Sequence, residues 1–351
     1  MEIFDLLAEH GHEQVVFCHE PEAGYRGIIA IHDTTLGPSL GGCRFWNYGS
    51  DQEALIDVLR LSKGMTYKAA VAGLNLGGGK SVIIGDNKTV RREAIFRAHG
   101  RFVESLKGRY ITAEDVGTSV DDMDYVLMET EHVTGIRGGS GDPSPVTAFG
   151  VYRGIKAVAH RKLGSDELEG VRVAVQGLGH VGCYLCEDLA EDGARLVVTD
   201  IDEEKVADVA ARFGAEAVAP DAIYDVEAEI FAPCALGAVV NDETIPRFRF
   251  HAIAGAANNQ LAEERHGGEL ERRGILYAPD YVINGGGLIN VYGEIQGWSA
   301  DQSKRKAAEI YESLLALFEI AENEGIPTYE AADRLAERRI KQVAAIQRNW
   351  V

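Results

Sequence analysis

The sequence predicts an α/β protein made of two domains with a cleft between them. Short apolar runs alternate with helical patterns along most of the chain. A segment rich in glycine and proline, from Gly135 to Pro145, has the composition of a domain boundary. In the second half, a strand pattern runs straight into a glycine fingerprint. A chain of 351 residues, 46% of them hydrophobic, is long enough to bury two cores.

The composition limits the kinds of partner that the chain can have. A formal net charge of −20 repels phosphate backbones and anionic lipids, so we expect no nucleic acid and no membrane as partners, but a small-molecule substrate. No apolar run approaches membrane-spanning length, and the segment from Met1 to His10 lacks the pattern of an export signal. These observations favour a cytoplasmic protein.

The five cysteines are odd in number and scattered, which argues against a disulfide framework. Cys183 and Cys186 form a CxxC pair, but no second pair of cysteines or histidines completes a zinc site. We therefore expect reduced thiols, a packing role for this pair and no bound metal.

Residues 1–137 are predicted to form one α/β domain. A capping residue and an acidic first turn predict that a helix begins at Asp51. The other elements expected in this domain are strands over Val15–Cys18 and Gly27–Ile31, and helices over Arg91–Leu106 and Ser119–Glu131.

The helix from Asp51 carries a lysine in a position that is costly for a cation. Lys68 shares a helical stripe with Leu61, Met65 and Ala72, so we expect it on the apolar face. Burying an unpaired ammonium costs several kcal/mol, and an incoming carboxylate would pair with it. The alternative is that Lys68 extends from the helix end into solvent.

A second lysine, Lys80, follows the glycine run Gly77–Gly79 and precedes a buried-strand pattern over Ser81–Ile84. Residues without a Cβ would let the backbone approach a ligand closely, although the run could equally be a simple turn. A lysine that is desolvated beside another cation has a lowered pKa and can act as a general base. The two lysines together predict an anion anchor and a proton-transfer group.

An acidic pair, Glu114 and Asp115, ends the apolar strand pattern that begins at Tyr110. We expect one of the two carboxylates to face inward. The usual alternative for such a pair is a solvated turn, and the residues alone do not choose between the two carboxylates.

The second domain is predicted over 138–327, and its glycine fingerprint lies between two strand patterns. The fingerprint consists of Gly177, Leu178, Gly179, His180, Val181 and Gly182. A helix follows, and the second strand ends at Asp200, which is the order and spacing of a Rossmann-type dinucleotide-binding unit. A carboxylate at Asp200 would accept the ribose hydroxyls and repel a 2′-phosphate, so NAD is favoured over NADP.

Further apolar runs continue this pattern as a parallel wound sheet. They lie at Glu229–Ala232, Ala252–Ala256 and Ile275–Tyr277, and long helices are expected over Lys304–Glu324 and Tyr329–Gln347. Ligands bind at the carboxyl ends of such strands, which places Asn258 and Asn284 at the cleft. A role in forming turns is the alternative for both asparagines.

The segment YKAAVAGLNLGGGKSVII resembles the signature of the glutamate, leucine, phenylalanine and valine dehydrogenase family, and it agrees best with the leucine dehydrogenase branch. The resemblance runs nearly end to end. It continues through AIHDTTLGPSLGG, ITAEDVGTSVDDMD, SPVTAFGVYRG, APCALGAVVND, AGAANNQL, YAPDYVIN and GIPTYEAADRLAERR.

The resemblance implies a role for each candidate residue. Lys68 would bind the substrate α-carboxylate with the help of Asn284, Lys80 would be the base, and Asp115 would transfer protons. Residues near the cofactor would include Thr147, at the nicotinamide carboxamide, and Asn258, at the nicotinamide ribose. The side-chain pocket would consist of Leu40, Gly41, Ala113, Leu288 and Val291.

The activity implied is the NAD-dependent, reversible oxidative deamination of a branched-chain L-amino acid, namely leucine and also valine or isoleucine. The product would be the 2-oxo acid, with ammonia and NADH. The resemblance also implies a homo-octamer and a first domain completed by a returning helix at about 328–351.

Two features keep other substrates and functions open. The linker around Gly138 is a few residues shorter than in the leucine dehydrogenases that the chain resembles. Gly285 replaces the alanine that is usual in the leucine branch, and the stretch around it is more similar to the phenylalanine branch. Phenylalanine is therefore the rival substrate. A sensor that binds amino acid and NAD without turnover is the rival function, although it would not need the proton-transfer pair. Binding of another nucleotide, such as S-adenosylmethionine, conflicts with the pyrophosphate-type glycine spacing.

Overall fold

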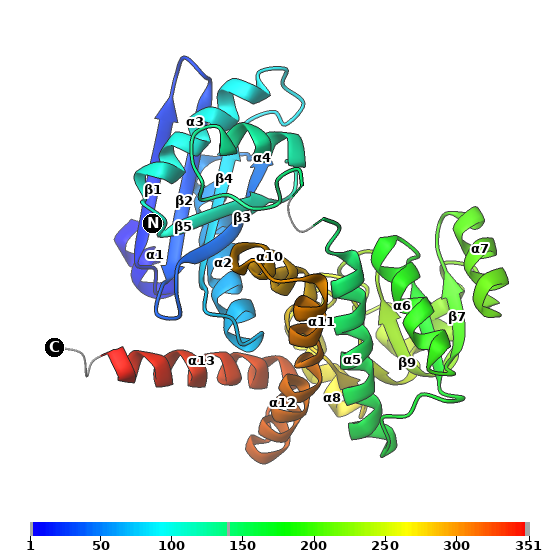
Figure 1. Ribbon diagram of the computed structural model, residues 1–351. Helices are drawn as coiled ribbons and strands as arrows, with labels where there is room; N and C mark the ends of the chain where they lie inside the picture. The colour runs from blue at the N-terminus through cyan, green and yellow to red at the C-terminus, as the bar shows by residue number, and fades with distance from the viewer. Residues whose placement is uncertain (1–2, 139–140, 348–351) are drawn as a thin grey trace. The chain divides into compact units, whose positions relative to one another are not determined.

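The computed structural model describes residues 3–138 and 141–347, which separate into two units (Figure 1). One unit contains the described residues up to Gly141 and from Ala336 onward, and the other contains Asp142–Leu335. The predicted boundary segment includes 139–140 and the predicted last helix includes 348–351, and these positions lie outside the described residues. Each unit has its own sheet, so the predicted two-domain α/β class is confirmed.

The sheet of the first unit has the order β1-β2-β4-β3-β5. Its strands are β1 (Gln14–Glu20), β2 (Tyr25–Asp33), β3 (Ser39–Trp46), β4 (Gly77–Ile84) and β5 (Tyr110–Glu114). β2 pairs antiparallel with β1 and with β4, whereas β3 is parallel to both β4 and β5. The carboxyl ends of β3, β4 and β5 therefore lie at the same edge.

Helices cover both faces of this sheet. Apolar side chains of α1 (Ile3–His10) and α2 (Asp51–Val71) form one core with Ile28, Ala30 and Val82. On the opposite face, α3 (Arg92–Ser105) and α4 (Val120–Leu127) pack with residues such as Phe45 and Ile83. The capping residues are Ser50 for α2 and Ser119 for α4, and α4 ends four residues before the predicted Glu131.

The glycine run Gly77–Gly79 lies inside β4, in the middle of the sheet. A Cβ at Gly78 would collide with Thr66 and Ser62 of α2, and a Cβ at Gly79 would collide with the ring of Tyr110. The missing side chains therefore allow α2 and neighbouring residues to pack closely on β4. This corrects the prediction that the run makes room for a ligand.

The second unit is built on a fully parallel sheet with the order β11-β10-β9-β6-β7-β8. Its strands are β6 (Arg172–Gln176), β7 (Arg195–Thr199), β8 (Glu216–Ala217), β9 (Glu227–Pro233), β10 (Arg249–Ile253) and β11 (Leu276–Tyr277). The predicted parallel wound sheet is confirmed. A crossover helix, α6 (His180–Glu191), joins β6 to β7, and α7 (Glu203–Phe213) joins β7 to β8.

The remaining helices are α5 (Ser144–Leu163), α8 (Arg265–Arg272), α9 (Asp280–Ile283), α10 (Gly286–Gln296), α11 (Ala300–Ala308), α12 (Ile310–Glu324) and α13 (Thr328–Gln347), and short 3₁₀ turns cover Ala222–Asp225 and Ile245–Arg247. The single helix predicted over Lys304–Glu324 is in fact the pair α11 and α12, which meet at Glu309. From α13, the Arg339 guanidinium donates hydrogen bonds to the carbonyls of Ala70 and Leu74, at 3.1 and 2.7 Å. Among the described helices, none is long and apolar enough to cross a lipid bilayer.

Candidate active site

Lys80 lies at the centre of the first unit's sheet. Successive residues of β4 alternate between the two faces, and Lys80 shares a face with Gly78 and Val82, which contact α2 and its core. Its side chain is only 7% exposed, and Nζ lies 3.1 Å from Oδ1 of Asp115. The structure therefore pairs a buried ammonium with the carboxylate at the end of the neighbouring β5.

The surroundings of Lys80 suit proton transfer. Burial lowers the pKa of its ammonium, Asp115 opposes that effect, and the nearby Arg44 cation lowers the pKa further, so that the net direction is downward. A lysine with a lowered pKa has a larger fraction of the free amine at neutral pH. The sequence named Lys68 as the second cation, and the structure places a further cation, Arg44, in contact with Asp115.

Asp115 is fixed through its backbone as well as its carboxylate. Its N–H donates to the hydroxyl of Thr118 at 2.8 Å, and that hydroxyl donates to the carbonyl of Cys43 at 3.1 Å. A side chain on Gly42 would crowd the Cβ of Asp115, so the glycine leaves the space that this residue occupies. Of the predicted acidic pair, Asp115 contacts Lys80 and Glu114 is exposed.

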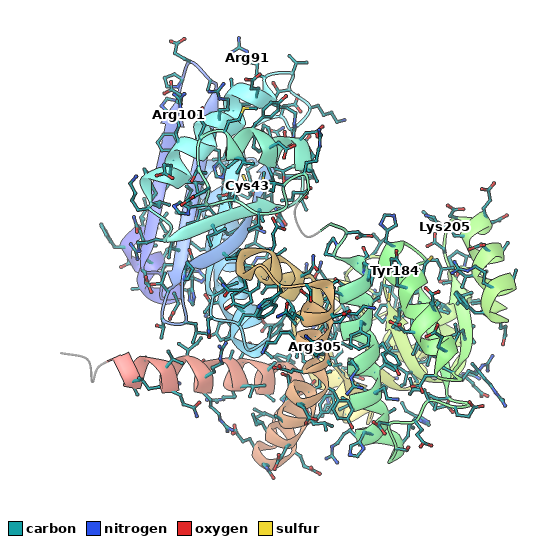
Figure 2. The ribbon with its side chains drawn as sticks, viewed as in Figure 1. Cys43, Arg91, Arg101, Tyr184, Lys205 and Arg305 are labelled. Carbon is teal, nitrogen blue, oxygen red and sulfur yellow. The ribbon has the colours of Figure 1, made fainter. Side chains whose placement is uncertain are left out.

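The two faces of this sheet differ in the side chains that they carry, as Cys43 (labelled in Figure 2) and its neighbour Arg44 illustrate. The Cys43 thiol belongs to the core under α3 and α4, and burial raises its pKa to about 12. Next to it on β3, Arg44 faces the opposite way and contacts the charged pair. The cluster of Lys80, Asp115 and Arg44 therefore lies on the face of the sheet opposite the core that contains Cys43.

Sequence reasoning missed three residues that support this pair, namely Arg44, Asp57 and Tyr48. Arg44 Nε lies 2.9 Å from Oδ2 of Asp115, and its Nη1 lies 2.8 Å from Oδ2 of Asp57 on α2. Asp57 also accepts a hydrogen bond of 2.7 Å from the Tyr48 hydroxyl and pairs with Arg60 at 3.1 Å. The available signal was an arginine inside the otherwise uncharged run of β3.

Lys68 lies in the last turn of α2 and is half-buried. The fully buried face of this helix is formed by other residues, among them Val58, Ser62 and Thr66, whereas Leu61 and Met65 are also half-buried. The predicted stripe is thus the margin of the buried face rather than its centre.

The predicted pocket residues of the first unit are Leu40, Gly41 and Ala113. Leu40 and Gly41 are buried on β3, and Ala113 is half-buried on β5. A Cβ at Gly41 would collide with the carbonyl of Gly79, so backbone already fills the space that a side chain would take. A glycine at position 41 therefore allows β3 to pack closely on β4.

In the second unit, the fingerprint glycines meet different surroundings. Gly177 has φ +99° and packs against Ala235, and a Cβ at Gly182 would collide with the carbonyl of Gly177. In contrast, a Cβ at Gly179 would meet nothing within 4 Å. Gly179 caps the start of α6, whose N-terminal amides favour an anion. Open space at this cap fits a dinucleotide pyrophosphate.

Asp200 follows β7 and closes the fingerprint loop from the other side. Its Oδ2 accepts the N–H of Leu178 at 2.6 Å, and its Oδ1 accepts the N–H of Asp202 at 2.9 Å. Leu178 is buried and Val181 is half-buried, whereas His180 is exposed, with Nδ1 3.6 Å from the carboxylate of Asp142. Asp200 therefore ties the loop to β7.

The other predicted residues of this unit lie on α5, on α10, in the turn before α10 and in the loop that follows β10. Asn284 is buried, and its amide donates to Oδ1 of Asn258 at 2.7 Å. Thr147 uses its hydroxyl to donate to the carbonyl of Pro143 at 2.9 Å, which is an ordinary contact within the first turn of a helix. Leu288 is buried and Val291 is half-buried, one turn apart on α10.

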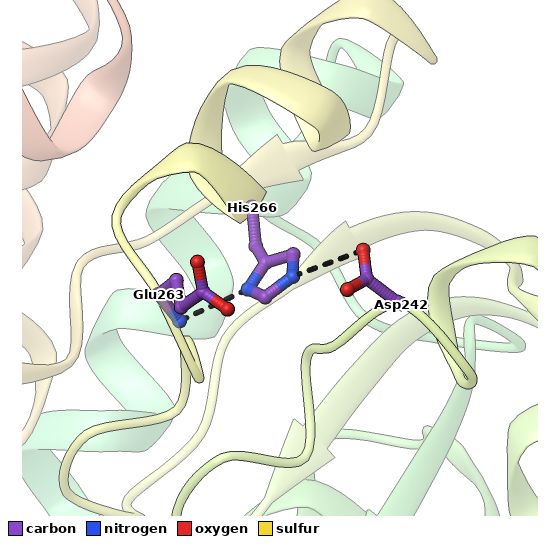
Figure 3. A group of neighbouring side chains, drawn as sticks. All are labelled: Asp242, Glu263 and His266. Carbon is purple, nitrogen blue, oxygen red and sulfur yellow. Dashed lines mark hydrogen bonds and ion pairs between the residues drawn. The ribbon is translucent and has the colours of Figure 1, made fainter.

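Within the described residues, one group has the composition and spacing of metal ligands, namely Asp242, Glu263 and His266 (Figure 3). Arg265 already pairs with both carboxylates, at 2.5 Å to Asp242 and 2.8 Å to Glu263. The N–H of Glu263 donates to Nδ1 of His266 at 3.0 Å, which puts the proton of a neutral ring on Nε2, facing Asp242 at 3.4 Å. The contacts of Asp242, Glu263 and Arg265 therefore tie the neighbouring loop to the start of α8.

Comparison with known proteins connects both units to dehydrogenases. A family model described as the dimerisation domain of Glu/Leu/Phe/Val dehydrogenases matches residues 12–132. The model of glutamate/leucine/phenylalanine/valine dehydrogenases matches 138–206 and 198–348.

Individual relatives cover nearly the whole chain. The leucine dehydrogenase of Thermoactinomyces intermedius is 58% identical, with 98% of this chain and 94% of that protein aligned. The phenylalanine dehydrogenase of Bacillus thermotolerans is 50% identical over 97% of this chain and 90% of that protein. The crystal structure of L-tryptophan dehydrogenase from Nostoc punctiforme superposes with a TM-score of 0.92, at 49% identity, covering 98% of this chain and all of that one.

Proposed function

The chain belongs to the glutamate/leucine/phenylalanine/valine dehydrogenase family, and we propose that it deaminates leucine and other branched-chain L-amino acids reversibly, with NAD as oxidant. The products are the 2-oxo acid, ammonia and NADH. Relatives named leucine dehydrogenase are 55 to 58% identical to this chain, whereas relatives named for phenylalanine or tryptophan are 50% identical. The gap in identity supports leucine over the aromatic amino acids.

The buried Lys80–Asp115 pair is the observation that carries the proposal, because it is the equipment for moving protons at a reacting amine. NAD, when bound, accepts the hydride from the substrate Cα. Lys80 acts as the base that activates the water attacking the imino carbon, and Asp115 carries protons to and from the substrate nitrogen. Lys68 pairs with the substrate carboxylate, and Asn284 assists it.

The cofactor is held by the fingerprint loop and the residues around it. Gly179 and the first amides of α6 receive the pyrophosphate, and Asp200 receives the ribose hydroxyls. Thr147 and Asn258 contact the nicotinamide end. A sensor without turnover would bind the same two ligands, but it would gain nothing from burying an ammonium beside a carboxylate, which costs free energy.

The test is a panel of amino acids mixed with the protein and NAD, followed by NADH absorbance. Leucine should exceed alanine by more than about tenfold in kcat/KM, since each buried methylene contributes about 0.8 kcal/mol. Valine and isoleucine should differ only modestly from leucine. Glutamate should be rejected, because an uncharged pocket cannot pair its side-chain carboxylate.

The outcomes of this panel separate the alternatives. A leucine to phenylalanine ratio of kcat/KM below one would favour an aromatic substrate. Robust activity on glutamate would contradict the uncharged pocket. Binding of NAD and leucine without any NADH formation would support the sensor.

Replacing Asp200 with asparagine should narrow the preference for NAD over NADP by roughly tenfold, or about 1.4 kcal/mol. The amide oxygen can still accept the N–H of Leu178, although the N–H of Asp202 loses its acceptor, and the charge that repels a 2′-phosphate is lost. The measurement is kcat/KM for both cofactors. The matched control is Asp202→Asn, a nearby cap of α7, and an unchanged ratio in the Asp200 variant would assign cofactor choice elsewhere.

We also propose that the protein forms a homo-oligomer, an octamer, in the cytoplasm. The matched dimerisation-domain model over 12–132 supports self-association. Five cysteines without a disulfide are typical of a reducing compartment. Light scattering would give the subunit number, and a monomeric mass would contradict the assembly.

A further inference from the structure

We propose that Arg44 is a positioning residue for the reaction: it holds one oxygen of the Asp115 carboxylate so that the other faces Lys80. The inference rests on the proposed function, because it assigns Arg44 a part in that chemistry. The two oxygens of Asp115 have separate partners, with Oδ1 3.1 Å from Lys80 Nζ and Oδ2 2.9 Å from Arg44 Nε. Rotation of the carboxylate would break both contacts.

Arg44 is itself held from a second direction. Its Nη1 lies 2.8 Å from Asp57, whose side chain is 15% exposed and also binds the Tyr48 hydroxyl and Arg60. The guanidinium is planar and rigid, so contacts through Nε and Nη1 fix its orientation. Arg44 therefore links Asp115, at the end of β5, to Asp57 on α2.

A lysine at position 44 could not hold both carboxylates as the arginine does. Its ammonium is a point charge on a flexible stem, whereas the arginine offers two donors in a fixed fork to two carboxylates. The backbone of Asp115 is already fixed by Thr118. What remains free without Arg44 is the rotation of the carboxylate, which is the movement that matters for a group exchanging protons with a substrate.

Arg44 also contributes charge at this site. The groups that act most strongly on Lys80 are Asp115 at the end of β5 and Arg44 and Cys43 on β3, while α2 brings Asp57 and Lys68 to the same face of the sheet. Removing the Arg44 cation removes a repulsion, so the pKa of Lys80 should rise. Because the free amine is the active form, the rising limb of the deamination pH profile should then move to higher pH.

The experiment compares Arg44→Met and Arg44→Lys with wild type and with the control Arg60→Met. Arg60 also forms an ion pair with Asp57, but its side chain is 62% exposed and the pair does not include Asp115. For each variant, kcat and KM for leucine are measured across pH, together with KM for NAD and the melting temperature. All rates are compared below the melting temperature of the least stable variant.

Arg44→Met should lower kcat at least tenfold, move the rising limb to higher pH and leave KM for NAD unchanged. Arg44→Lys should return the rising limb of the pH profile to its wild-type position but recover only part of kcat. The lysine restores the positive charge but not the two fixed donors of the guanidinium. Arg60→Met should match wild type in kcat and in the position of the rising limb. Should Arg44→Met fail to fold, Asp57→Asn provides the test, because loosening the anchor of Arg44 should lower kcat without a loss of NAD binding.

A folded Arg44→Met protein with a lower melting temperature but wild-type kcat and pH limb would make Arg44 merely structural and overturn the inference. The same result for Asp57→Asn would do so if the Arg44 variants do not fold. Failure of the proposed function is distinguishable, because wild type itself would then form no NADH with any amino acid of the panel.

Discussion

Replacing Lys80 with alanine is expected to lower kcat for leucine by two to four orders of magnitude, the usual contribution of a general base and roughly 3 to 5 kcal/mol of barrier. The ammonium is buried in the centre of a sheet, and its pKa is lowered chiefly by that burial. The residues proposed to bind NAD belong to the other unit, so the dissociation constant of NAD should stay within about twofold of the wild-type value.

The measurement is kcat for leucine together with an NAD titration by fluorescence. Lys88→Ala is the matched control, since Lys88 is an exposed lysine of the same unit and should give wild-type rates. Turnover within a fewfold of wild type in the Lys80 variant would remove this residue from the mechanism. Loss of NAD binding together with turnover would point instead to a folding defect.

Replacing Asp115 with asparagine should also lower kcat, by about two to three orders of magnitude, because the amide keeps the shape of the carboxylate but cannot carry a proton. The residual activity should have a distinctive pH dependence. Asp115 raises the pKa of Lys80, so without its charge that pKa falls further and the rising limb moves to lower pH. This shift is opposite in sign to the one expected for Arg44→Met.

Glu114→Gln is the control for Asp115, because it removes an adjacent carboxylate that is exposed. Its kcat should remain near wild type. If Glu114→Gln lost activity and Asp115→Asn kept it, the assignment of the acidic pair would be reversed. Equal, small effects of both changes would place proton transfer on another group.

The dinucleotide-binding unit could be predicted from the sequence because its signals are local. A strand, three glycines, a helix and a second strand ending in Asp200 follow one another within about thirty residues. The spacing of the hydrophobic residues and the positions of the glycines are therefore enough to predict such a unit, even when the rest of the fold is unknown. The structure has β6, α6 and β7 in that order.

The support around Lys80 could not be predicted in this way, since its partners are distant in sequence. Arg44 lies 13 residues from Asp57 and 71 from Asp115, and no local pattern connects them. The same reason explains why the glycines of β4 were predicted to make room for a ligand. Gly78 is small because Ser62 and Thr66 of α2 press against it, which a strand pattern does not reveal.

The break between α11 and α12 shows a different limit. Glu309 ends one helix and begins the next, although neither proline nor glycine stands nearby. A continuous helical pattern over Lys304–Glu324 was therefore the natural prediction. Nothing in the local sequence explains the break.

The unequal surroundings of the three fingerprint glycines bear on how such a loop can change over evolution or in protein design. Gly177 and Gly182 are constrained by Ala235 and by each other, so selection for a folded chain alone preserves them, with or without a nucleotide. Gly179 faces open space, and only selection for ligand binding preserves it there. A descendant that no longer bound the cofactor would therefore keep Gly177 and Gly182, because the fold requires them. Gly179 would be the first of the three glycines to be substituted.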